Sequence, residues 1–255
     1  MHSLAIAIML ASVLSACLAP RTPLPPLPTH TPLPPTHTPT PTIVWFPSTP
    51  TFTPRPNQEV TTPTPDMRPS FGALLIEEDF SDPEHWTLGR AGALSAALGK
   101  AELSLAISQP RGYIYSLFSE PVPGDFYAEI TAAPSLCKDS DEYGLLLRVS
   151  SNLEFYRFSI SCNGEARLDR YNNELPSSLK PFTPSGAIPP GAPSVTRLAV
   201  LARGKEINYY ANGEYLFSTR DPYLLNGSLG VFARSAGDNA VTVSFSDLKI
   251  YSAFP

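Results

Sequence analysis

From about residue 71 onward, the chain is a series of short runs in which apolar and polar side chains alternate or apolar residues cluster. The runs expected to form strands are 73–78, 100–107, 112–118, 126–132, 143–150, 153–161, 165–171, 196–203, 206–211, 215–218, 228–233 and 241–251. The gaps between them are short, and no stretch keeps the 3.6-residue apolar period of a helix. The pattern therefore predicts an all-β fold of two antiparallel sheets.

Two Asn-Gly pairs indicate how neighbouring strands align. Asn212-Gly213 lies between two alternating runs and predicts a tight hairpin. At Asn163-Gly164, a two-residue loop would mix polar and apolar side chains on each face of the hairpin. A three-residue loop pairs Ser161 with Glu165 and places the apolar side chains on one face and the polar ones on the other. Because a slip of one residue turns every side chain to the other face, we expect the three-residue loop.

In this register one face of the hairpin is apolar and belongs to the core. The opposite face carries Phe155, Arg157, Ser159, Arg167, Asp169 and Tyr171, and a preceding hairpin that turns at Ser151-Asn152 would add Arg148 across from Phe155. One interpretation is a solvated ion pair between Arg157 and Asp169. The other is a ligand-binding face, because arginine forks bind hydroxyls or carboxylates and aromatic rings stack on sugars.

The N-terminal part of the chain has a different composition. More than half of the 30 prolines lie between Pro20 and Pro69, interleaved with threonine. Proline fixes φ and lacks an N–H donor, so this segment cannot form a core and favours extended polyproline II. We therefore expect residues 17–69 to form a disordered Pro/Thr-rich stalk and residues 70–255 to form one globular domain.

Residues 1–16 have the features of a signal peptide. Their apolar run, Leu4 to Leu14, is too short to span a bilayer and ends in Leu14-Ser15-Ala16-Cys17. This ending resembles the lipobox of bacterial lipoproteins, a resemblance that implies lipidation of Cys17. It also implies export and a membrane anchor on the outer side of a bacterial cell envelope. The alternative is an ordinary secretory signal with an incidental cysteine.

Charge and cysteine content narrow the possible partners. The net charge is −5, with no run of basic residues, which argues against nucleic acid as a partner. If Cys17 carries lipid, Cys137 and Cys162 remain as a pair in an exported domain. The predicted hairpin brings residue 162 opposite residue 141, near Cys137, so we expect a disulfide; two free thiols are the alternative.

Several segments together resemble concanavalin A-like lectin and glucanase jelly rolls. They are Asp79–Pro83 with Trp86, Tyr143–Arg148, Leu153–Phe158, Asn208–Gly213, Gly227–Val231 and Val243–Leu248. The resemblance covers nearly all of 71–251. It implies that the first and last strands pair and that the concave sheet is the usual glycan site, but it does not specify an activity.

We find no convincing catalytic constellation. The nearest match to the Glu-x-Asp-x-x-Glu strand of jelly-roll glucanases is Glu77-x-Asp79-x-x-Asp82, whose last member precedes a proline in a turn. His85 is the only histidine of the domain and is expected to be a solvated turn residue. The acidic residues Asp139, Asp141 and Glu142 are a weak candidate for Ca²⁺ ligands, and a solvated charged loop is the alternative.

The sequence thus favours a lipid-anchored, non-catalytic binding module that recognises glycan through the arginine-bearing face. One alternative is a sugar-active hydrolase of the jelly-roll type. The other is a structural envelope protein that packs on a protein partner. No cofactor is expected beyond the weak Ca²⁺ candidate.

Overall fold

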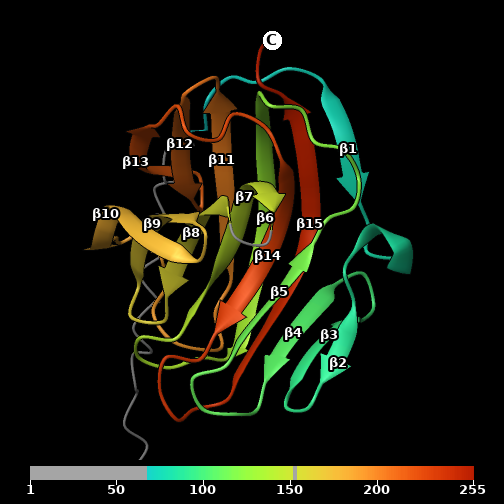
Figure 1. Ribbon diagram of the computed structural model, residues 1–255, viewed down its shortest axis with the longest axis vertical. Coiled ribbons are helices and arrows are strands. Elements are labelled where there is room, and N and C mark those ends of the chain that lie inside the picture. The colour runs from blue at the N-terminus through green and yellow to red at the C-terminus, as the bar shows by residue number, and fades with distance from the viewer. Residues whose placement is uncertain (1–67, 152–153) are drawn as a thin grey trace, which may run out of the picture. The chain divides into compact units, whose positions relative to one another are not determined.

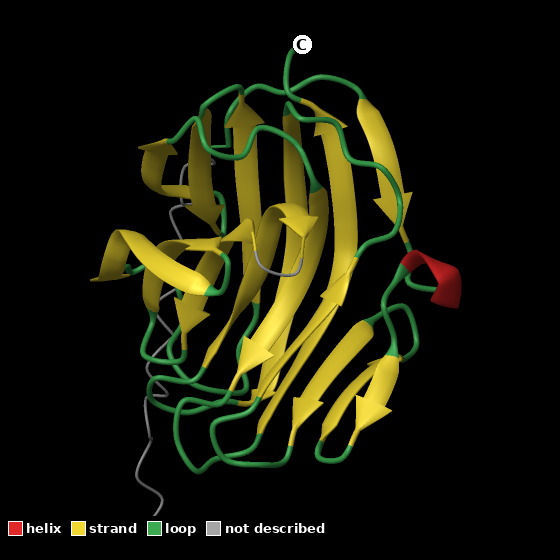
Figure 2. Ribbon diagram, viewed as in Figure 1, coloured by secondary structure: helices red, strands yellow, loops and turns green. Residues whose placement is uncertain are grey.

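The computed structural model describes residues 68–151 and 154–255, which are almost entirely β-structure (Figure 2). The signal peptide, Cys17 and the Pro/Thr-rich stalk lie outside the described residues. Within the described part, the one helical element is a 3-10 turn at Pro83–His85. None of its helical structure is long and apolar enough to cross a membrane.

The larger of the two sheets has its strands in the order β13-β12-β11-β6-β15-β4-β3-β2 (Figure 1). These strands are β13 (Glu214–Arg220), β12 (Glu206–Ala211), β11 (Thr196–Arg203), β6 (Phe126–Leu136), β15 (Val241–Ser252), β4 (Leu103–Ile107), β3 (Leu94–Leu98) and β2 (Gly89–Ala91). The first strand, β1 (Leu74–Glu78), pairs with the last strand, β15, as the jelly-roll resemblance implies.

The smaller sheet has six strands in the order β10-β9-β8-β7-β14-β5. They are β10 (Leu175–Pro184), β9 (Glu165–Asn172), β8 (Glu154–Ser161), β7 (Glu142–Ser151), β14 (Ser228–Arg234) and β5 (Tyr113–Leu117). In Figure 1, β5 and β14 lie in front of β6 and β15. Both sheets are antiparallel throughout.

The main core lies between the inner faces of the two sheets. Alternate residues of β8 enter it, among them Tyr156 and Phe158. The same core cluster contains Val200 of β11 and Phe245 of β15. All four side chains are fully buried. Burial of about 25 cal/mol per Å² of apolar surface is the main force that holds two such layers together.

Both predicted Asn-Gly turns are confirmed. Ala211 pairs with Glu214, so Asn212-Gly213 is a two-residue loop, and both of its residues have positive φ. Ser161 pairs with Glu165, and Gly164 has a φ of 82°, as a three-residue loop with a left-handed glycine requires.

Three strands were not predicted: β2, β3 and β10. The first two form a short hairpin of mostly small residues, where the apolar signal is weak. Strand β10 contains prolines at positions 176, 181 and 184, which argue against a strand in sequence-based reasoning. The prolines are tolerated because β10 lies at the edge of its sheet, where only one side of the strand must form hydrogen bonds.

The chain segment that enters the domain packs on part of the outer face of the larger sheet. Phe71 stacks on Tyr127 with ring centroids 4.2 Å apart and also contacts Tyr251. Arg203 donates hydrogen bonds to the carbonyl oxygens of Ser70 and Ala253. The chain therefore enters the domain on the side opposite the outer face of the smaller sheet.

Candidate binding face of the smaller sheet

The outer face of the smaller sheet carries the side chains that the sequence placed there, with one exception. Phe155 pairs with Tyr171, Arg157 with Asp169, and Ser159 with Arg167. Their neighbours in sequence point into the core, because side chains of a strand alternate between its two faces. The predicted separation of apolar and polar faces in this hairpin is confirmed.

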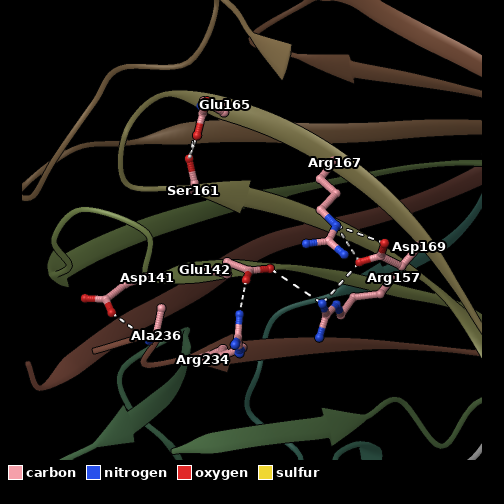
Figure 3. Close-up of polar contacts among 9 residues, drawn as sticks. All are labelled: Asp141, Glu142, Arg157, Ser161, Glu165, Arg167, Asp169, Arg234 and Ala236. Carbon is pink, nitrogen blue, oxygen red and sulfur yellow. Dashed lines mark hydrogen bonds and ion pairs between the residues drawn. The ribbon is translucent and has the colours of Figure 1, made fainter. Parts of the chain in front are cut away.

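Charged side chains on this face form an alternating network (Figure 3). Arg167 Nε lies 2.8 Å from Asp169 Oδ2, and Arg157 Nη2 lies 3.2 Å from the same oxygen. Arg157 Nη2 is also 3.7 Å from Glu142 Oε2, and Glu142 Oε1 accepts a hydrogen bond from Arg234. Each carboxylate is thus held by two guanidinium groups that belong to different strands.

The centre of this network is buried, which corrects the expectation of a solvated Arg157–Asp169 pair or of a row open to water. The side chains of Arg157 and Asp169 are 7% and 0% exposed. The guanidinium carbon of Arg157 lies 4.9 Å from the centre of the Tyr171 ring and 5.5 Å from that of Phe232, so aromatic rings cover it. Burial alone lowers the pKa of Arg157, but the charge of Glu142 and other acidic neighbours outweighs this, and the net shift is upward.

Partly exposed aromatic rings border the network and line a groove. Tyr113 and Tyr115 of β5 lie across from Phe155 and Tyr171, and these rings, with Arg157, Glu174 and Arg234, line an open pocket of about 630 Å³. Phe155 and Tyr171 stack with centroids 4.7 Å apart. Burial raises the pKa of Tyr113, so its phenol stays neutral, and its hydroxyl has no hydrogen-bond partner among the described residues.

A smaller apolar pocket continues this groove along the sheet. Its lining residues are Tyr113, Tyr115, Leu117, Leu146, Val149 and Phe155. Three of them also line the larger pocket, so the two pockets form one surface over β5, β14, β7 and β8. A concave, mostly apolar surface with a few fixed polar groups is the usual composition of a small-molecule site.

Arg148 does not belong to this face, and its assignment there is wrong. Regular pairing from Leu147 opposite Tyr156 would bring Arg148 opposite Phe155, but the register shifts before Ser151 pairs with Glu154. Arg148 adopts a φ of 51° within this irregularity, which redirects its side chain. The side chain is buried and donates hydrogen bonds to the carbonyl oxygens of Leu224 and Gly124, both at 2.9 Å.

The three acidic residues considered as Ca²⁺ ligands do not converge. Asp139 is exposed, whereas Asp141 accepts hydrogen bonds from the backbone N–H groups of Lys138 and Ala236. Glu142 belongs to the arginine network. Within residues 68–151 and 154–255, no group of three or more acidic, histidine or cysteine side chains is arranged to hold a metal ion.

The carboxylates considered as a match to the glucanase strand have local partners. Glu77 forms an ion pair with Lys249, its partner in the register of β1 and β15. Asp79 and Asp82 accept hydrogen bonds from nearby backbone N–H groups. His85 is not simply a solvated turn residue, because its Nδ1 lies 2.6 Å from the buried carboxylate of Glu78. This contact raises the pKa of His85.

The predicted disulfide between Cys137 and Cys162 is present, with Cα atoms 5.9 Å apart. It joins the end of β6 to the β8–β9 turn, at one end of the smaller sheet.

Four residues that line the larger pocket were missed by sequence reasoning: Tyr113, Tyr115, Glu174 and Arg234. Both tyrosines lie in a predicted strand and alternate with core residues, which is a signal that they share one face. Their proximity to β8 and β9 depends on β14, which pairs with both β5 and β7. No local pattern reports such long-range pairing.

Comparisons with known proteins establish the fold. No protein-family model matches the sequence, and no curated protein matches it. The carbohydrate-binding module CBM66 from Bacillus subtilis matches with a TM-score of 0.53 and 14% identity, over 66% of this chain and 96% of the module. A Bacillus subtilis protein of unknown function with a galectin-like fold matches with a TM-score of 0.53 and 14% identity, over 72% and 97%.

The catalytic domain of an endo-1,3-beta-glucanase from Thermotoga petrophila RKU-1 is also similar. It matches with a TM-score of 0.51 and 8% identity, over 71% of this chain and 97% of that domain. A carbohydrate-binding module and a hydrolase domain thus share this architecture, and the likeness is one of fold. The predicted jelly-roll sandwich is confirmed.

Proposed function

We propose that the domain binds carbohydrate in the groove on the outer face of its smaller sheet, without hydrolysing it. The observation that carries this proposal is the combination of partly exposed tyrosine rings with an arginine–carboxylate network whose centre is buried, both at one open pocket. Rings pack on the C–H faces of sugars, and fixed N–H donors orient sugar hydroxyls. The jelly-roll fold, which a carbohydrate-binding module shares, supports the same function.

The pairing of the network carboxylates favours binding over hydrolysis. Glycoside hydrolysis uses a pair of carboxyl groups, of which one must be free to give up a proton to the leaving group. Glu142 and Asp169 are each held by two guanidinium groups, so they serve as ion-pair partners. This arrangement suits a preorganised surface better than an acid–base pair.

The proposal includes a lipid anchor at Cys17, with residues 17–69 as a spacer on the outer side of a bacterial envelope. The lipobox-like end of the signal sequence and the proline-rich composition support it. A Cys17→Ser variant should move from the membrane fraction to the soluble exported fraction. If this variant sediments with membranes as the wild type does, the anchor lies elsewhere.

Glycan binding is tested by screening the purified full-length chain on a glycan array and titrating the hits. Tyr115→Ala should weaken binding about tenfold, because loss of one ring contact removes on the order of 1.4 kcal/mol. Tyr215→Ala is the matched control, since Tyr215 is equally a strand tyrosine but lies exposed on the larger sheet.

Two outcomes of these experiments would contradict the proposal. A blank array at high protein concentration would refute glycan binding and favour a protein partner for this face. Equal losses in the Tyr115 and Tyr215 variants would show that a glycan binds outside the groove.

A further inference from the structure

The arginine network and the groove beside it carry three guanidinium groups and three carboxylates. The guanidinium groups are those of Arg157, Arg167 and Arg234, and the carboxylates are those of Glu142, Asp169 and Glu174. Three arginines on one face suggest a receptor for an acidic sugar. The charges balance, however, so the face offers no net attraction to an anion.

The arginines are also committed to buried partners. The Glu142 side chain is 1% exposed, and its ion-pair partners among the described residues are Arg234 and Arg157. A sugar carboxylate that bound Arg234 would have to share this guanidinium with Glu142. The sugar carboxylate would then weaken the ion pair that compensates the buried charge of Glu142. It would also lie close to that negative charge, and both effects oppose binding.

A sugar hydroxyl avoids this competition. Arg234 contacts Glu142 through Nη1, and its side chain is 40% exposed, so other N–H groups of its fork remain for a ligand. A hydroxyl can accept from such an N–H without displacing the internal carboxylate. It can also donate to a nearby acceptor such as Glu174, which lines the same pocket and which would repel an acidic sugar.

We propose that the glycan bound by this face is uncharged, and that Glu142 sets this preference by neutralising Arg234 and Arg157. This inference rests on the proposed function. Glu142 acts through the two arginines, so it is a positioning residue for the ligand-binding groups. Glu174 adds to the preference from the rim of the groove.

The test uses matched ligands: neutral hexose oligosaccharides and their counterparts oxidised to uronic acids at C6. Titration of the full-length chain should give affinities at least tenfold higher for the neutral member of a bound pair. Glu142→Gln leaves the face with one net positive charge and should reduce this ratio about tenfold. Glu214→Gln, on the larger sheet, is the control and should leave the ratio unchanged.

Glu174→Gln keeps the test decisive if Glu142→Gln does not fold, because Glu174 lies in an exposed turn. This variant should also lower the ratio of neutral-sugar affinity to uronic-acid affinity. Its affinity for the neutral sugar should change less than this ratio does. A wild-type preference for the uronic acid, or an unchanged ratio in the variants, would overturn the inference and leave glycan binding intact. If neither member of any pair binds, the proposed function itself is refuted.

Discussion

Replacement of Arg148 by methionine tests whether this residue supports the fold or the binding face. Methionine has a similar length and fills the space, but it cannot donate hydrogen bonds. In the structure, Arg148 is buried on the core side of β7 and joins two loops through the carbonyl oxygens of Leu224 and Gly124. We therefore expect a loss of stability without a loss of glycan affinity in the folded fraction.

The size of the effect follows from these contacts. Two hydrogen bonds from a charged donor contribute about 3–6 kcal/mol together, at about 1.5–3 kcal/mol each. This is partly offset because the variant no longer buries a guanidinium whose partners are carbonyl groups, and such burial lowers the pKa of Arg148. We expect a net decrease of about 3 kcal/mol in the free energy of unfolding, which corresponds to about 6–12 °C in Tm.

The assay is urea denaturation followed by tryptophan fluorescence, with the m value compared between variants. Arg90→Met is the control, because Arg90 lies exposed on β2, and it should change stability by less than about 0.5 kcal/mol. If Arg148→Met is as stable as the control and loses glycan affinity instead, the Arg148 side chain belongs to the candidate binding face and not to the interior of the domain.

Three further predictions concern stability. Phe71→Ala should lower the free energy of unfolding by about 1–2 kcal/mol through loss of its ring stack. It should also raise hydrogen exchange selectively in residues 68–73, and an equal increase throughout the domain would contradict this. Removal of the Cys137–Cys162 disulfide by double serine substitution should cost about 3 kcal/mol, since it closes a loop of 25 residues; an unchanged urea midpoint would argue against a stabilising bond. The raised pKa of His85 beside Glu78 means that its contribution to stability is complete below about pH 6.5 and is lost as the pH rises through the folded pKa. Tm measured from pH 5.5 to 9 should therefore fall with rising pH more in the wild type than in His85→Gln, and parallel curves would exclude the effect.

Local pattern was sufficient to predict much of the fold. Alternation along β8 and β9, together with the left-handed preference of Gly164, gave the register in which Ser161 pairs with Glu165. The same reasoning separated core residues from outer-face residues in this hairpin. It also brought Cys137 and Cys162 together, because the hairpin geometry depends on residues close in sequence.

The candidate binding face could be predicted only in part. Arg157 and Tyr171 lie on this face as predicted, but the burial of Arg157 could not be predicted, since it depends on Phe232 from a distant strand. Tyr113 and Arg234 join the face because β14 pairs with both β5 and β7.

The sequence by itself determined the β class, the tight turns and the alternation of faces, because each of these follows from the conformational preferences of a few neighbouring residues. The tertiary structure decided which strands became neighbours, where β7 departs from regular pairing at Arg148, and how a proline-rich edge strand was accommodated. These features depend on the packing of whole sheets against one another. A charged side chain is buried or exposed according to the partners that this packing supplies, and such partners lie far away in the sequence.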